Sequence, residues 1–98
     1  MIEVHDNPAR SRYEARVEGE VAAFVEYRRD DHATVLVHTE TSPAYRGQGV
    51  AEHLVQGALD AIRSQGRTVV PQCPFVAKFI GEHPEYADLV LSSVRRQL

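Results

Sequence analysis

Residues 44–51 read AYRGQGVA, with two glycines separated by one residue and an arginine directly before the first of them. Glycine is a poor helix former. Even so, the apolar residues that follow recur at intervals of three and four, which predicts a helix over residues 48–65. Glycines at the start of a helix leave its first free N–H groups uncovered. We therefore interpret this stretch as a loop that brings backbone amides close to a ligand.

The chain before this loop follows the period of two that is typical of strands. Residues 12–20 alternate apolar and charged side chains, which places Glu14 on the side away from the core, and residues 21–29 continue the alternation. The run HATVLVHT, residues 32–39, is apolar at most positions and predicts a strand buried on both faces. A short strand near residues 2–4 flanks the set. Short polar connections make these strands antiparallel neighbours.

The chain after the helix predicts one more strand, at residues 68–72, and a short second helix that ends at Gly81. Strand, helix and strand at this spacing imply a right-handed crossover, which makes the strand at 68–72 parallel to the one at 32–39. The predicted fold class is α/β. It is an antiparallel meander closed by one βαβ unit, with helices packed on the sheet, in a single domain over residues 1–98.

Composition limits the function classes that fit the chain. Hydrophobic residues make up 43% and charged residues 26%, as in ordinary globular proteins, and the formal net charge of −3 disfavours a broad nucleic-acid surface. The sequence has no apolar run that could cross a bilayer and no signal-peptide pattern at its start, so we expect a cytoplasmic protein. The five histidines lack metal-ligand spacing, and one cysteine excludes an internal disulfide.

The glycine loop joins a buried strand to the N-terminus of the main predicted helix, which is the positive end of the helix dipole. Gly47 and Gly49 leave the amides open there, and such a site binds phosphate. Arg46 adds a guanidinium that can hold a phosphate through two hydrogen bonds. The loop has neither the GK[ST] ending of a P-loop nor the GxGxxG pattern of a dinucleotide fold.

Residues 46–51, RGQGVA, match the pattern [QR]-x-x-G-x-[GA] and so resemble the pyrophosphate loop of the GNAT superfamily of N-acetyltransferases. The stretches VHTETSPAYRGQGVAEHLV and VVPQCPFVAKFIGEHPEYADLV extend the resemblance over about residues 35–90. They are similar to a small single-domain branch, the YidJ-like or "CG" acetyltransferase-like proteins. The resemblance implies a reduced GNAT fold that uses acetyl-CoA as co-substrate, without naming the acceptor.

The same resemblance implies where the cofactor lies. In GNAT-like folds, pantetheine enters between the strand before the loop and the strand after the main helix, and it pairs with backbone groups of the first strand. In this sequence the first of these strands is expected to end at residues 37–39 and the second at residues 72–73. The residues expected at the cofactor are Val37, Thr39, Tyr45, Arg46, Gly47, Gln48, Gly49, Val50 and Ala51.

Cys73 falls where the thioester should arrive. It could accept the acetyl group, protonate the departing thiolate of coenzyme A, or be a small buried residue without a role. A helix that begins just after it would favour the thiolate. The resemblance adds weight to a catalytic role, since the matching cysteine of that family is proposed as catalytic. Phe75 and Phe79 occupy the helix on which superfamily members often carry a tyrosine acid.

Glu40 and His38 are the candidate bases. Glu40 follows the strand expected to carry the thioester and could deprotonate an attacking amine directly or through water, or it could be a solvated glutamate. His38 could accept a proton near neutral pH, or it could be a buried structural histidine.

The leading functional hypothesis is an acetyl-CoA-dependent N-acetyltransferase that acts on an amine, which an open groove and an acidic balance would make a protein or peptide amine. The alternative is a coenzyme A or acyl-CoA binding module with little or no turnover. A pure interaction domain is a third reading, against which the intact glycine loop argues. Either a monomer or a weak dimer fits the sequence.

Overall fold

The computed structural model describes residues 1–90, and its centre is a five-stranded sheet whose strands lie in chain order. The strands are β1 (Ile2–Asn7), β2 (Arg12–Val17), β3 (Glu20–Arg29), β4 (Ala33–Thr41) and β5 (Thr68–Pro71). The helices are α1 (Val50–Ser64) and α2 (Pro74–Glu82), with short 3₁₀ helices η1 (Pro8–Arg10), η2 (Pro43–Tyr45) and η3 (Pro84–Leu89). Strands β1 to β4 pair antiparallel, and β5 pairs parallel to β4. The predicted α/β meander with one βαβ unit is confirmed.

Most elements start or end within a few residues of the sequence prediction, and two of the differences lie next to the candidate site. Strand β4 continues to Thr41 instead of ending at residue 39, so Glu40 lies within the strand and not after it. Helix α2 begins at Pro74 and ends at Glu82, one residue past the expected end at Gly81. Proline is favoured at the first helical position because its missing N–H would have no partner there and its φ already suits the helix.

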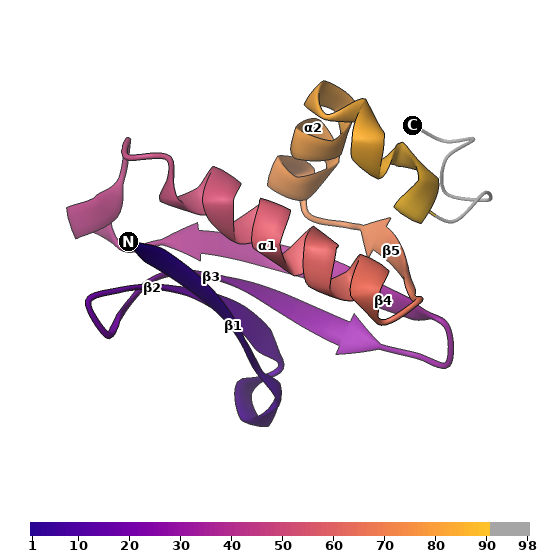
Figure 1. Cartoon of the computed structure of the whole chain (residues 1–98), viewed down its shortest axis with the longest axis horizontal. Helices are drawn as coiled ribbons and strands as arrows, with labels where there is room; N and C mark the ends of the chain where they lie inside the picture. The colour runs from indigo at the N-terminus through magenta and orange to yellow at the C-terminus, as the bar shows by residue number, and fades with distance from the viewer. Residues whose placement is uncertain (91–98) are drawn as a thin grey trace.

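Helix α1 crosses one face of the sheet and buries the apolar stripe that the sequence predicted (Figure 1). The buried residues of the stripe are Val50, Leu54, Val55, Ala58, Leu59 and Ile62. Each buried leucine or isoleucine stabilises the fold by about 1.5–3 kcal/mol relative to exposure. Helix α2 and η3 lie beside α1, where the Tyr86 hydroxyl donates a hydrogen bond of 2.8 Å to Asp60 of α1. Tyr86 and Leu89 are buried, as expected.

Helices α1 and α2 both lie on one side of the sheet (Figure 1), and we call the opposite face the open face. Strand β4 was expected to be buried on both faces, but this is correct only for residues 33–36. The next two residues, Val37 and His38, are exposed. The reason is the length of β5, whose last residue, Pro71, pairs with Leu36. Beyond that point β4 has no neighbour on this side.

Glu14 of β2 was expected on the solvent side of its strand, but it is buried, with 1% of its surface exposed. Two arginines cover its carboxylate: Arg12 donates a hydrogen bond of 2.8 Å and Arg16 one of 2.7 Å. Asn7 of β1 donates a third, of 3.0 Å. Burial alone would raise the pKa of this carboxyl, but these hydrogen bonds outweigh it and lower the pKa from 4.5 to about 2.

Replacing Glu14 with glutamine should destabilise the protein by about 3 kcal/mol at pH 7, because two guanidinium groups lose their counter-charge. The folded pKa lies below the unfolded one, so the carboxylate stabilises the fold above about pH 4.5 and stops doing so as the pH falls toward 2. The free energy of unfolding in urea should differ less between wild type and Glu14→Gln at pH 3 than at pH 7. Glu26→Gln, an exposed carboxylate on the same face, is the control. Equal losses for both variants would contradict the prediction.

Candidate active site

A β-bulge in β4 determines which side chains meet at the site. Glu26 of β3 pairs with His38 and Tyr27 pairs with Leu36, so Val37 is an extra residue without a partner on β3. A bulge shifts the alternation of side chains by one residue and leaves the backbone of the extra residue outside the ladder. Leu36 and Thr39 consequently face α1 together. Residues 38 and 40 face the open side.

The two parallel strands separate just past the bulge. The last ladder pair is Leu36 with Pro71, and the N–H of Cys73 donates a final hydrogen bond of 2.9 Å to the carbonyl of Leu36. From there β4 continues alone, while the chain after β5 turns into α2. The resemblance to GNAT-like folds implied a separation at residues 37–39 and 72–73, and the pairing of β4 with β5 ends next to these residues.

Thr39 and Cys73 face each other across this opening, with 3.4 Å between the threonine hydroxyl oxygen and the sulfur. Thr39 is half-buried and Cys73 is 5% exposed. The sequence placed Thr39 at the cofactor through its backbone alone. It gave no sign of this side-chain contact, which joins residues 34 positions apart.

The environment of Cys73 favours its thiolate. Burial raises the pKa of the thiol, but the hydroxyl of Thr39 and the N–H groups of Val76 and Phe75 lower it by more, so the pKa lies below its usual value. Cys73 is the N-cap residue of α2, although its sulfur makes no close capping hydrogen bond. The two amides therefore act mainly as nearby dipoles at the positive end of the helix.

The glycine loop adopts a backbone that few other residues could adopt. Gly47 and Gly49 both have φ of 78°, in the left-handed region, and Gly49 is the N-cap of α1. A Cβ built on either glycine meets no atom within 4 Å, so both face open space. That space is a hollow of about 270 Å³ that extends from Thr41 to Glu52. The loop at the start of α1 therefore borders a cavity, and the binding of phosphate at its amides stays a prediction.

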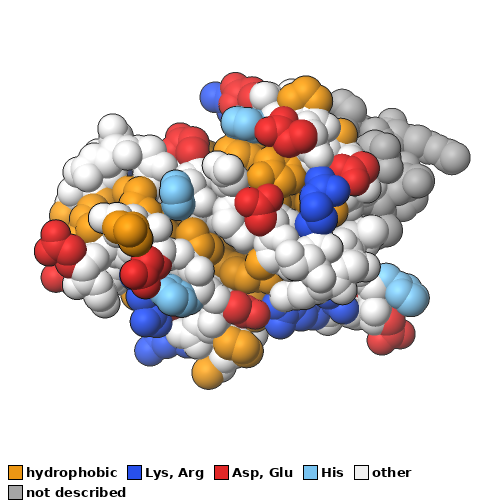
Figure 2. All heavy atoms as spheres, viewed as in Figure 1, with side chains coloured by type: hydrophobic (Ala, Val, Ile, Leu, Met, Phe, Trp, Pro, Cys, Tyr) orange, Lys and Arg blue, Asp and Glu red, His pale blue; other side chains and the backbone are white. Residues whose placement is uncertain are grey.

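Arg46 lines the same hollow and is exposed. Its backbone N–H bonds to the carbonyl of Pro43, but its guanidinium has no hydrogen-bond or ion-pair partner within residues 1–90. On the α1 side of the molecule, basic and acidic side chains are interspersed (Figure 2). Because no broad basic surface of residues 1–90 attracts an anion on this side, an anion-binding site there needs donors from a few neighbouring residues. An unpartnered arginine beside free helix amides supplies the required donors.

The other loop residues support the loop more than they face the hollow. Tyr45 lines the hollow, but its hydroxyl points to Glu20 at 3.4 Å. The amide group of Gln48 donates a hydrogen bond of 3.2 Å to the carbonyl of Ala44. Val50 is buried in the core, and Ala51 is half-buried at the rim. Their backbone amides, and not their side chains, are what they can offer a ligand.

His38 and Glu40 form a pair on the open face, with 3.3 Å between the imidazole and carboxylate. The two side chains are 54% and 60% exposed, so the reading of His38 as a buried structural histidine is wrong. The bulge places this pair on the face opposite to Cys73. Cys73 and the His38–Glu40 pair therefore lie near the same segment of β4, but on opposite faces of the sheet.

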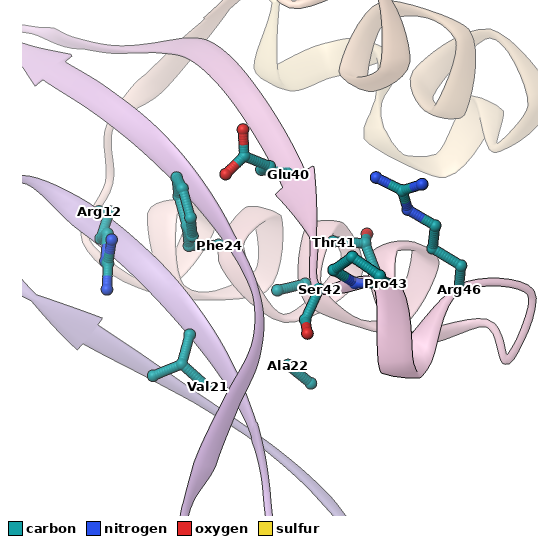
Figure 3. Close-up of a pocket in the computed structure, with 10 residues that line it drawn as sticks. Arg12, Val21, Ala22, Phe24, Glu40, Thr41, Ser42, Pro43 and Arg46 are labelled. Atoms are coloured by element: carbon teal, nitrogen blue, oxygen red, sulfur yellow. The ribbon is translucent and has the colours of Figure 1, made fainter.

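A larger hollow, of about 410 Å³, lies on the open face beside Glu40 (Figure 3). Its walls come from β2, β3, the end of β4 and the turn that follows. Phe24 forms part of the wall, and the guanidinium of Arg12 lies 4.3 Å from the centre of its ring. Thr41 and Arg46 line both hollows, so the two meet at the end of β4. The sequence did not single out Phe24 or Arg12, since strand alternation predicts a face but not a cavity.

Residues 1–90 lack the features of two other classes of site. No helix there is long and apolar enough to cross a membrane. No group of three or more His, Cys, Asp or Glu side chains is arranged to hold a metal ion in that part of the chain.

Comparison with known proteins gives consistent results. A family model described as GCN5-related N-acetyl-transferase matches residues 12–89. Protein NATD1 of Xenopus tropicalis is 31% identical over 85 residues, which cover 85% of this chain and 78% of that protein. Protein NATD1 of Bos taurus is 41% identical over 49 residues, and that of Danio rerio is 36% identical over 58 residues. These two matches cover 50% and 57% of this chain, and the chain spans about half the length of those relatives, 43% and 53%.

Solved structures share the fold. The solution structure of a GCN5-like protein from Staphylococcus aureus superposes with a TM-score of 0.69, covering 91% of this chain and 87% of that one at 22% identity. A ribosomal-protein-alanine N-acetyltransferase from Brucella melitensis biovar Abortus 2308 gives a TM-score of 0.58, covering 83% and 61% at 20% identity. At these identities the likeness concerns the fold alone.

Proposed function

Because this chain belongs to the family of GCN5-related N-acetyltransferases, we propose that it binds acetyl-CoA and transfers the acetyl group to an amine. One observation carries the proposal. The loop at Gly47 and Gly49 opens α1 beside a hollow, and it follows the strand that parts from β5 at Cys73. In this proposal the loop holds the pyrophosphate and Cys73 lies near the thioester.

The residues present fit this co-substrate. The hollow at the loop combines free helix amides with the unpartnered guanidinium of Arg46, which are the donors that a pyrophosphate needs. The β-bulge leaves the backbone of Val37 unpaired with β3, and beyond Leu36 the other edge of β4 has no pairing with β5. A pantetheine arm could hydrogen-bond to β4 there as an added strand would. When bound, acetyl-CoA supplies an activated acyl group as a thioester.

The residues around the opening take three roles in direct transfer of the acetyl group: base, oxyanion donor and acid. His38 or Glu40 takes the proton that the amine loses as its nitrogen bonds to the acyl carbon. The unpaired backbone of Val37 stabilises the carbonyl oxygen as charge develops on it. As the carbon–sulfur bond breaks and its electrons pass to sulfur, the thiol of Cys73 gives its proton to the departing thiolate and regains one from water. Base and acid then act from opposite faces of the sheet.

The amine comes from the open face in this proposal. The hollow beside Glu40 lies there, and no residue of α1 or α2 lines it. An open surface suits the amine of a protein or peptide better than a small metabolite, which needs an enclosing pocket. Glu40 shares this hollow with the guanidinium groups of Arg12 and Arg46, so the preference for a cationic acceptor rests on the formal net charge of −3.

A second candidate function is a coenzyme A or acyl-CoA binding module with little or no turnover. The exposure of His38 and Glu40 favours it, because a solvated pair is a weaker base than an enclosed one. Both functions share the cofactor seat and differ only in what happens on the open face.

One experiment separates the two functions. The protein is incubated with acetyl-CoA, with and without a lysine-rich peptide. The free thiol of released coenzyme A is then assayed, and the masses of protein and peptide are measured by mass spectrometry. Acetylated peptide with stoichiometric thiol supports transfer. Calorimetric binding without either product supports the binding module. Absence of binding would refute both.

Arg46→Ala should weaken coenzyme A binding by about 1–3 kcal/mol, roughly 5- to 150-fold, since one charged hydrogen-bonding group is lost from the phosphate seat. Calorimetry at two salt concentrations measures the loss, which should shrink in high salt. Arg28→Ala is the matched control, because Arg28 is also exposed but lies on β3 away from the loop. Equal affinity for Arg46→Ala and wild type would show that Arg46 does not contact the ligand.

A further inference from the structure

The contact between Thr39 and Cys73 depends on the bulge at Val37. Leu36 faces α1, so regular alternation would turn residues 38 and 40 to the same side and Thr39 to the open face. The extra residue reverses this and aims the Thr39 hydroxyl at the sulfur, 3.4 Å away. A bulge costs part of the strand pairing. Here it produces a specific side-chain contact across the opening.

Thr39 is held in this position by its neighbours. It pairs across the ladder with Val25, which is fully buried, and it is itself half-buried. A β-branched side chain in a strand has few rotamers, so the hydroxyl direction is restricted. Cys73 is fixed from its own side by its N–H bond to Leu36 and by the first turn of α2. Both partners therefore meet in one geometry.

The hydroxyl can serve either protonation state of the sulfur. It accepts from the thiol and donates to the thiolate, and hydrogen bonds to charged groups are the stronger kind. Donation to the thiolate agrees with the lowered pKa of Cys73. Burial raises this pKa, and the hydrogen bond from the Thr39 side chain is the largest of the effects that lower it.

We propose that Thr39 is a positioning residue that orients the Cys73 sulfur toward the cofactor opening and stabilises its thiolate form. The proposal rests on the proposed function for its consequence in acetyl transfer, but the interaction itself exists in the free protein. Cys73 is the one cysteine of the sequence, so thiolate absorbance in the ultraviolet, measured against a Cys73→Ser baseline, reports this group alone.

Thr39→Val keeps the shape of the side chain and removes its hydroxyl. The thiol titration of this variant should move up by about 0.5–1 pH unit, a roughly three- to tenfold loss of thiolate near neutral pH. Thr39→Ser should restore the wild-type midpoint, because it returns the hydroxyl. Thr68→Val, the same substitution on β5 away from the opening, should titrate like wild type.

An unchanged midpoint in Thr39→Val, or a Thr39→Ser variant that titrates like Thr39→Val, would overturn the proposal. If Thr39→Val does not give the circular dichroism of the folded protein, the titration of Thr39→Ala decides in its place by the same criteria. Coenzyme A binding is measured in parallel by calorimetry. Absence of binding in the wild type refutes the proposed function, whereas the titration alone decides the role of Thr39.

Discussion

Replacing Gly49 with valine is expected to abolish measurable coenzyme A binding. Gly49 is the N-cap of α1, and its missing side chain leaves open space in the hollow of about 270 Å³. A valine side chain would occupy the phosphate seat and cover the first amides of the helix. Loss of two such charge-assisted hydrogen bonds, at about 1.5–3 kcal/mol each, corresponds to roughly a hundredfold or more in affinity. Isothermal calorimetry with coenzyme A measures the effect.

Backbone strain alone must be separated from blocking of the seat, since φ of 78° also disfavours valine. Gly66→Val is the matched control, because Gly66 has φ of 70° and equally open surroundings at the other end of α1. Gly49→Asn is the second variant, since asparagine tolerates this backbone but still fills the seat. Full binding by Gly49→Asn, or equal loss in Gly66→Val, would show that the loop does not hold the phosphate.

Most of the fold could be predicted because it follows from local periodicity. The alternation over residues 12–29 and the intervals of three and four after Gly49 each specify one element, and short connections leave few topologies. The parallel pairing of β5 with β4 followed from the crossover rule and is confirmed.

The bulge at Val37 could not be predicted, although it determines the site. A strand pattern shows that side chains alternate, but not that one residue is extra, because the extra residue is identified only by its partner strand. Glu14 illustrates the same limit. Its burial depends on Arg12, Arg16 and Asn7, which cover it only once β1 and β2 are paired.

The two parts of the candidate site, the glycine loop and the catalytic candidates, differ in how far the sequence alone predicts them. The phosphate loop is contiguous in sequence, and its glycines and arginine carry their chemistry wherever a helix follows. The contact of Thr39 with Cys73 and the opposite placement of His38 depend on the relative position of two strands and a helix. Residue type and the resemblance to GNAT-like folds therefore named the candidate residues, but not the faces of the sheet on which they lie.

Replacing Cys73 with alanine is expected to reduce acetyl transfer by roughly a hundredfold or more, the usual contribution of a positioned acid, with coenzyme A affinity unchanged within about twofold. The thiol lies at the opening between β4 and β5 and away from the glycine loop, so the cofactor seat is left intact. Transfer rates to a peptide amine and calorimetric affinities measure the two effects separately.

Cys73→Ser is the sharper variant, because a hydroxyl keeps the size but gives up its proton far less readily than a thiol whose pKa is already lowered. Within residues 1–90, the side-chain partner of the Cys73 sulfur is the Thr39 hydroxyl, and His38 and Glu40 lie on the other face. Because no base contacts the sulfur there, we assign Cys73 the role of acid and not that of nucleophile. Intact-mass analysis after quenching should then show no acetyl group on Cys73 during turnover. An acetylated cysteine that forms and decays at the rate of transfer would instead make it the nucleophile. If Cys73→Ala and Cys73→Ser both transfer acetyl at the wild-type rate, the sulfur has only a structural role, and water supplies the proton to the coenzyme A thiolate.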